Sequence, residues 1–163
     1  MIKAGIITAS DKGHAGERID ESGRLLSEIL QKMGAEVVDY VVVPDERSII
    51  SSNMKRMSDE LGIDLILTTG GTGFSPRDVT PEATLDVIDR NVPGIPEAMR
   101  AASLRMTPHA MLSRAVSGIR NRTLIINLPG SPRGVQECMD IILPAIPHGI
   151  QILKGQTGEC ARK

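Results

Sequence analysis

Aromatic residues are almost missing from this chain, whose 163 residues include one Tyr, one Phe and no Trp. Modules that bind single-stranded nucleic acid stack bases on several aromatic side chains, so the composition disfavours this class. Charge points the same way, because 19 Lys and Arg against 20 Asp and Glu leave a formal net charge of −1. A chain so balanced has no global attraction to nucleic acid or anionic lipid. We therefore expect no nucleic-acid partner.

Cysteine is scarce, and long apolar runs are missing. Cys138 and Cys160 form neither a disulfide framework nor a zinc set, which indicates a reducing compartment. The three histidines (His14, His109 and His148) are too scattered along the chain to predict a metal site. No apolar run approaches the ~18 residues of a membrane span, and the N-terminus is typical of a strand, not a signal peptide. We expect a cytoplasmic protein with no membrane partner.

The length predicts a single domain with a core of its own. A chain of this size buries roughly 70% of its unfolded surface, which is enough for folding without staples. No internal repeat or low-complexity segment interrupts it. We expect one domain over residues 1–155 and a polar, flexible tail over 156–163.

Hydrophobic patterning predicts alternating strands and helices. Continuous apolar runs rich in β-branched residues predict buried strands at 2–9, 37–43, 64–69 and 123–128. Apolar residues at three- to four-residue spacing predict a first helix that ends at Gly34 and further helices at 50–61, 80–90 and 96–106. A last helix is expected to start at residue 132 and to be bent or interrupted by prolines 144 and 147. Thr80 is the expected hydroxyl cap of the third helix, and the segment 110–119 fits neither pattern clearly. The fold class is α/β, a three-layer α/β/α arrangement around a mostly parallel sheet.

Ligands of open α/β sheets bind beyond the carboxyl ends of the strands. Four polar segments follow predicted strands there: 10–13, 44–47, 70–78 and 129–134. Gly70, Gly71 and Gly73 permit positive φ and close backbone approach, so their amides could converge on an anion. The alternative is a tight turn. Neither a Walker A loop nor a complete dinucleotide fingerprint is present.

Charged side chains lie beside these glycines in the sequence. Asp45 and Asp78 follow different strands at the same sheet edge, where two carboxylates can hold magnesium against phosphate oxygens; solvated loop acids are the alternative. Arg77 would neutralise phosphate or pair with a neighbouring acid. The helix start at Ser131 suits an anion or a simple cap. Phe74 would wall a ring-shaped ligand or pack under the loop.

Five motifs together resemble the Mog/MoaB family of molybdenum-cofactor biosynthesis. The longest is TGGTGFSPRDVTPE at 69–82, and the others lie at 8–11, 43–45, 103–114 and 127–132 in the family's order. The resemblance spans nearly the whole chain, and it implies the α/β molybdopterin-binding fold that the strand pattern indicates independently.

The resemblance implies a nucleotidyltransferase that moves AMP from ATP to the terminal phosphate of molybdopterin, with Mg²⁺ as cofactor and pyrophosphate as product. The two catalytic acids of the family match Asp45 and Asp78, which would also hold the magnesium. The expected substrate-binding residues are Ser10, Asp11, Gly70, Gly71, Thr72, Gly73, Arg77, Ser113, Pro129, Gly130 and Ser131.

Other readings and the partners follow from the same resemblance. A non-catalytic molybdopterin-binding or carrier protein would share these motifs, whereas the related molybdate insertase domain normally belongs to a longer chain. The family implies a homotrimer, with hexamers in some relatives, and contact with molybdopterin synthase and molybdate insertase. We expect residues 93–111, which are rich in alanine and methionine, to supply an interface; burial against the sheet is the alternative.

Overall fold

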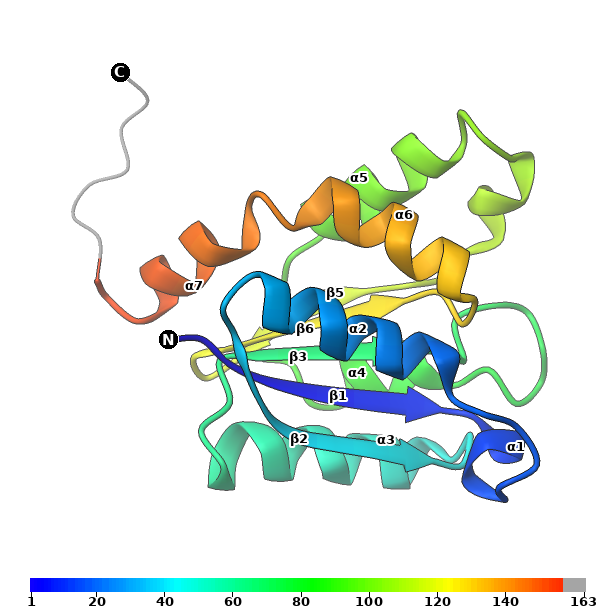
Figure 1. Ribbon diagram of the computed structural model, residues 1–163, viewed down its shortest axis with the longest axis horizontal. Helices are drawn as coiled ribbons and strands as arrows, with labels where there is room; N and C mark the ends of the chain where they lie inside the picture. The colour runs from blue at the N-terminus through cyan, green and yellow to red at the C-terminus, as the bar shows by residue number, and fades with distance from the viewer. Residues whose placement is uncertain (157–163) are drawn as a thin grey trace.

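The computed structural model, which describes residues 1–156, consists of a six-stranded sheet with helices on both faces (Figure 1). The strand order is β2-β1-β3-β6-β5-β4. The first four strands in this order are parallel, and β4 and β5 continue the sheet antiparallel. The strands are β1 (Lys3–Ala9), β2 (Glu36–Val43), β3 (Leu65–Thr69), β4 (Arg90–Asn91), β5 (Ser117–Arg120) and β6 (Thr123–Leu128). The predicted three-layer α/β class with a mostly parallel sheet is confirmed.

Side-chain alternation divides the core between the two faces of the sheet. Ile6 packs on one face and Ile7 on the other, and Leu65 and Ile66 separate in the same way. One face is covered by α2 (Glu21–Lys32), α5 (Gly94–Ser103), α6 (Pro132–Ile142) and α7 (Ile146–Leu153). The other is covered by α3 (Arg47–Lys55), the π-helix η1 (Arg56–Glu60) and α4 (Thr80–Leu85). The central strands are buried on both faces, which explains their continuous apolar runs.

The parallel strands all end at the edge on the right of Figure 1, and the connections that leave this edge carry the polar motifs. The short helix α1 (Asp11–His14) follows β1, and residues 44–46 follow β2. Residues 70–79 follow β3, and residues 129–131 connect β6 to α6. Four separate parts of the sequence therefore meet here.

Local capping explains where the flanking helices begin and end. The Asp20 carboxylate accepts a hydrogen bond from the Gly23 amide at 2.9 Å and caps α2. Gly34, with φ of 80°, ends α2 as predicted, because this left-handed conformation suits glycine. The predicted interruption of the last helix is also confirmed, since α6 ends at Ile142 and α7 starts at Ile146.

The structure corrects the prediction for the helix that follows the glycine-rich segment. This helix, α4, ends at Leu85 and not near Arg90, which lies in β4. Thr80 is not its cap: it lies in the first turn, and its hydroxyl donates to the Gly70 carbonyl at 2.9 Å. A tertiary hydrogen bond has replaced the local cap that the sequence suggested.

The ambiguous segment 110–119 contains the end of a 3₁₀ helix, η2 (Pro108–Leu112), and most of β5. Among residues 1–156, no helix is long and apolar enough to cross a membrane. Except for Gln156, the tail expected at 156–163 lies outside the described residues.

Candidate active site

The glycine loop, residues 70–73, leaves β3 in a backbone conformation that depends on glycine. Gly70 and Gly71 have φ of 92° and 68°, a region that other residues rarely adopt. A side chain on Gly70 would also overlap the carbonyl oxygen of Ala9. Gly73, by contrast, does not have a positive φ. The predicted need for glycine is therefore strongest in the first half of the loop.

All four carbonyls of the glycine loop accept hydrogen bonds from two residues of the protein. Thr80 donates from Oγ1 to Gly70 at 2.9 Å and from its amide to residue 71 at 3.1 Å. Arg114 donates from its amide to residue 72 at 2.9 Å and from Nε to residue 73 at 2.8 Å. Within residues 1–156, the amides of residues 71, 72 and 73 donate to no acceptor. Amides fixed in place but unpaired are suited to binding an anion.

Arg114 fixes more than the loop itself. Its Nη2 donates to the Asp78 carbonyl at 2.8 Å, and its Nη1 forms an ion pair with Glu82 on α4. Burial opposes ionisation of Glu82, but hydrogen bonding and the positive charge of Arg114 outweigh it, so the pKa of this carboxyl is lowered. Arg114 was not among the predicted site residues, and its only signal in the sequence is its place next to Ser113 in a family motif.

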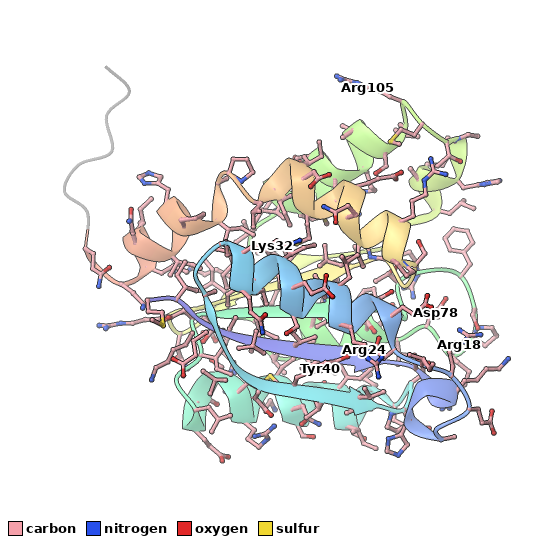
Figure 2. The ribbon with its side chains drawn as sticks, viewed as in Figure 1. Arg18, Arg24, Lys32, Tyr40, Asp78 and Arg105 are labelled. Atoms are coloured by element: carbon pink, nitrogen blue, oxygen red, sulfur yellow. The ribbon has the colours of Figure 1, made fainter. Side chains whose placement is uncertain are left out.

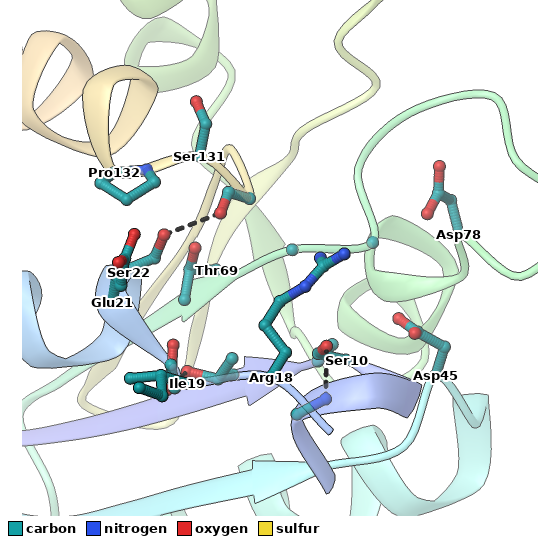
Figure 3. A pocket seen from close by; sticks show the side chains of 17 residues that line it. Ser10, Arg18, Ile19, Glu21, Ser22, Asp45, Thr69, Asp78, Ser131 and Pro132 are labelled. Atoms are coloured by element: carbon teal, nitrogen blue, oxygen red, sulfur yellow. Dashed lines mark hydrogen bonds between the residues drawn. The ribbon is translucent and has the colours of Figure 1, made fainter. Parts of the chain in front are cut away.

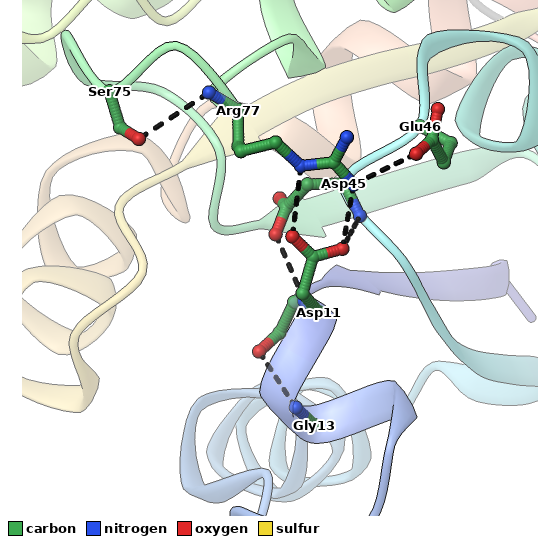
Figure 4. Close-up of polar contacts among 7 residues, drawn as sticks. Asp11, Gly13, Asp45, Glu46, Ser75 and Arg77 are labelled. Carbon is green, nitrogen blue, oxygen red and sulfur yellow. Dashed lines mark hydrogen bonds and ion pairs between the residues drawn. The ribbon is translucent and has the colours of Figure 1, made fainter.

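Asp45 is held by a reciprocal backbone contact with the start of α1 (Figure 4). Its Oδ2 accepts from the Asp11 amide at 2.9 Å, and its own amide donates to Asp11 Oδ1 at 3.0 Å. Asp78 is held in the same manner, because its Oδ2 accepts from the Ser75 amide at 2.9 Å. In both acids Oδ1 has no donor within residues 1–156. Each carboxylate is thus oriented by one oxygen and can bind a ligand with the other.

These two acids lie on either side of the glycine loop. A Cβ atom on Gly71 would lie 3.3 Å from Asp45 Oδ1, and one on Gly73 would lie 3.0 Å from Asp78 Oδ2. Burial raises the pKa of Asp45, as do the negative charges of Asp11 and Asp78; a backbone hydrogen bond from Asp11 opposes the increase. No group of three or more His, Cys, Asp and Glu within residues 1–156 is placed to hold a metal ion. Two carboxylates with free oxygens still fit Mg²⁺, which takes its other ligands from water and substrate phosphates.

Two cavities meet at the glycine loop. The acid pocket, of about 500 Å³, contains Asp45 and Asp78 together with the first half of the loop (Figure 3). The serine pocket, of about 530 Å³, contains Ser113, the second half of the loop and part of α5. Ser131 lines both. The volumes are those of small-molecule sites.

Most of the predicted site residues line one of these cavities. Seven line the acid pocket, namely Ser10, Asp45, Gly70, Gly71, Asp78, Gly130 and Ser131. The serine pocket is lined by Thr72, Gly73, Ser113, Pro129 and again Ser131. Ser131 caps α6, so the capping role that was the alternative for this residue is present in the structure, and Ser10 caps α1 in the same way.

Asp11 and Arg77 line neither cavity. Arg77 donates from Nε and Nη2 to Asp11 at 3.0 and 2.9 Å, and from Nη2 to Glu46 at 2.8 Å (Figure 4). These hydrogen bonds raise its pKa and offset its charge. Of the two roles expected for Arg77, the structure contains the pairing with acids. Phe74 is 69% exposed and lines neither cavity, which contradicts both of its expected roles.

The connection from α1 to α2 forms a wall of the acid pocket, and none of its residues was predicted to belong to the site. Asp20 accepts hydrogen bonds from Thr8 at 2.6 Å and from Tyr40, whose pKa is raised by burial and by this carboxylate. Ser22 donates to the Gly130 carbonyl at 2.7 Å and ties α2 to the loop after β6. Asp20 and Ser22 belong to none of the five motifs, and in the sequence only their place in a polar segment before a helix marks them.

A parallel α/β sheet with an amide-rich loop and two oriented acids at its carboxyl edge defines a protein that binds phosphorylated ligands. The family model described as "Probable molybdopterin binding domain" matches residues 5–148. The chain therefore belongs to the molybdopterin-binding domain family, as its motifs led us to expect.

Individual relatives cover almost the whole chain. It is 43% identical over 156 residues to the molybdopterin adenylyltransferase of Helicobacter pylori J99, covering 94% of this chain and 89% of that protein. It is 37% identical to the enzyme of the same name from Escherichia coli K12, with 98% and 89% covered. The crystal structure of the molybdopterin biosynthesis enzyme MoaB from Thermus thermophilus superposes with a TM-score of 0.91 at 48% identity, covering 98% of this chain and all of that one.

Proposed function

We propose that this protein transfers AMP from ATP to the terminal phosphate of molybdopterin, releasing pyrophosphate. The observation that carries the proposal is the glycine loop, whose four carbonyls are held while three amides stay unpaired between two oriented acids. The names of the relatives support the same reaction. ATP and molybdopterin are the two substrates.

The two cavities give each substrate a place. The acid pocket has the carboxylates that a nucleotide triphosphate with its metal requires, and the serine pocket offers Met99 and Met106 to a flat pterin ring. A phosphate oxygen of molybdopterin attacks the α-phosphorus, and the bond from that phosphorus to the bridging oxygen breaks. The electron pair leaves on pyrophosphate. The loop amides stabilise the charge on the non-bridging oxygens, and the cavities align the reactants.

Magnesium fits the donor set, and its proposed ligands are Oδ1 of Asp45 and Oδ1 of Asp78. When bound, it would neutralise phosphate charge and orient the triphosphate. The residues themselves supply the orientation, because each carboxylate is fixed through Oδ2 before any ligand arrives.

The test is pyrophosphate release from ATP, measured with molybdopterin present and absent. We expect release only when both substrates are present, and a loss of at least ~10²-fold in Asp78→Asn, which keeps the shape of the side chain and removes its charge. Binding of molybdopterin by this variant should remain. Binding without any turnover by the native chain would instead indicate the non-catalytic carrier protein.

Self-association belongs to the same proposal. Exposed apolar side chains cluster where the interface was expected or directly after it: Leu104, Met106, Met111 and Leu112 are 43–62% exposed. A patch of this kind on a monomer favours an interface over burial against the sheet. We propose a cytoplasmic homotrimer, or a hexamer built from it, with molybdopterin synthase and molybdate insertase as neighbours in the pathway. Light scattering that gave the monomer mass of 17.5 kDa at micromolar concentration would contradict the assembly.

A further inference from the structure

The acid pocket has an unusual charge for a place that must receive a polyphosphate. Its lining includes the carboxylates of Asp20, Glu21, Asp45 and Asp78, against a single basic residue, Arg18. One magnesium ion would offset two of the negative charges. A basic side chain in this lining would therefore favour the binding of a nucleotide triphosphate, and Arg18 is the one that the lining contains.

Arg77, the cation that the sequence suggested, does not serve this purpose. Its guanidinium is engaged by both oxygens of Asp11 and by Glu46, and it does not line the acid pocket. Drawing it to a ligand would also leave Asp11 without its ion-pair partner, and the Asp11 amide is what orients Asp45. Arg77 is thus part of the scaffold under the acids.

Arg18 is placed and prepared differently. Figure 2 shows it at the carboxyl edge of the sheet, the edge where Asp78 also lies, and in Figure 3 its side chain extends across the pocket. Within residues 1–156 its guanidinium forms no ion pair or hydrogen bond. The residues around it, from Ala15 to Ile19, are all exposed, so no packing restrains the side chain. Its donors are free to be used by a ligand.

We infer that Arg18 binds the pyrophosphate end of ATP, the β- and γ-phosphates that leave in the reaction. This assignment rests on the proposed function. The α-phosphate belongs near the loop amides, where attack occurs, so the remaining two phosphates fall toward the open part of the acid pocket. A planar guanidinium can donate two parallel hydrogen bonds to phosphate oxygens. It also stabilises the negative charge that develops on the leaving group.

The experiment compares Arg18→Ala with the control variant Lys12→Ala. Lys12 is also an exposed cation, but it lies on α1 and does not line the acid pocket. Calorimetric titration of each protein uses magnesium pyrophosphate, Mg·ATP and AMP. We expect Arg18→Ala to weaken pyrophosphate and ATP binding about tenfold, the scale of one exposed charge-assisted contact, and to leave AMP binding unchanged. Arg18→Lys should restore part of the loss. In turnover, the KM for ATP and the inhibition constant of pyrophosphate should rise, while the KM for molybdopterin stays the same.

The outcomes separate the two proposals. Native protein that binds neither ATP nor pyrophosphate would overturn the proposed function itself. Native protein that binds both, with Arg18→Ala binding them equally well, would overturn only the role of Arg18. An equal loss of AMP affinity would also refute the assignment, because Arg18 would then act on the adenosine or the α-phosphate. Thermal unfolding should be unchanged in Arg18→Ala, since the side chain is exposed and forms no ion pair or hydrogen bond within residues 1–156.

Discussion

Arg114 gives the sharpest test of how the glycine loop is held. In Arg114→Met the apolar stem is kept and the guanidinium is removed. The carbonyls of Gly73 and Asp78 then lose their donors, and Glu82 loses its ion-pair partner. The hydrogen bond from the Arg114 amide to the loop stays, so the loop should shift locally instead of unfolding.

The magnitude follows from burial. A hydrogen bond to a charged group contributes about 1.5–3 kcal/mol, but the Arg114 side chain is 34% exposed, so water replaces part of each lost contact. We expect the free energy of unfolding to fall by about 2–3 kcal/mol in total. For a chain of this length the melting temperature should then fall by about 4–12 °C. The affinity for molybdopterin should fall and adenylyl transfer should drop by about 10²-fold, because amides displaced by even 1 Å no longer meet the phosphate.

The assays are thermal unfolding by circular dichroism, molybdopterin binding and pyrophosphate release. Arg122→Met is the matched control, because Arg122 is exposed and its side chain forms no hydrogen bond or ion pair within residues 1–156. Arg114→Lys should recover stability better than transfer, since an ammonium cannot span the three acceptors as the guanidinium does. Wild-type binding and transfer in Arg114→Met, at any stability, would refute the idea that this residue positions the amides.

Two further predictions concern the acids and the glycines. The pKa of the Asp45 carboxyl is raised in the folded protein. The folded chain therefore holds this proton to a higher pH than the unfolded chain does, and stability is lost as the pH rises through the raised pKa. Asp45→Asn should therefore raise the melting temperature at pH 7 while abolishing transfer. In the native protein, the Mg²⁺ affinity should begin to fall at a higher pH than it would for a site with an ordinary aspartate. An unchanged or lower melting temperature would contradict this account. Gly71 has a positive φ, and a Cβ atom there would overlap Thr80, whereas a Cβ atom on Gly73 would meet only the Asp78 carboxylate. Gly71→Ala should therefore lose more stability than Gly73→Ala, and equal losses in denaturant titration would disprove the distinction.

The strands were the easiest part of the fold to predict. Strand β6 matches its predicted bounds because both its faces are buried and every residue in it is apolar or makes a buried polar contact. Strand β5 escaped detection because it is a short antiparallel strand that includes Gly118 and ends in half-buried residues. The end of α4 and the role of Thr80 were mistaken because a tertiary bond to Gly70 decided them.

The sequence predicted which loops form the site, but it did not predict which basic side chains are available to a ligand. Asp45 and Asp78 could be placed together because parallel strands end at one edge. The spacing of residues in the sequence could not show which arginine lacks a partner within the protein. Arg77 binds Asp11, which is 66 residues away in the sequence, and Arg114 binds Gly73, which is 41 residues away. Such contacts depend on how separate elements pack, which local patterns do not encode.

Consecutive residues of one loop line the two cavities, because residues 70 and 71 line the acid pocket and residues 72 and 73 line the serine pocket. The spacing of these residues along the loop is set by peptide dimensions, which do not vary with the residues around them. In the proposed reaction, the distance between the backbone contacts to the two substrates is then fixed by covalent geometry. Substitutions elsewhere in the lining, at Met99 or Ile19, could change which ring or base is admitted while leaving the reacting atoms equally far apart. A single loop that contributes its backbone to both cavities lets specificity evolve without disturbing the distance on which the chemistry depends.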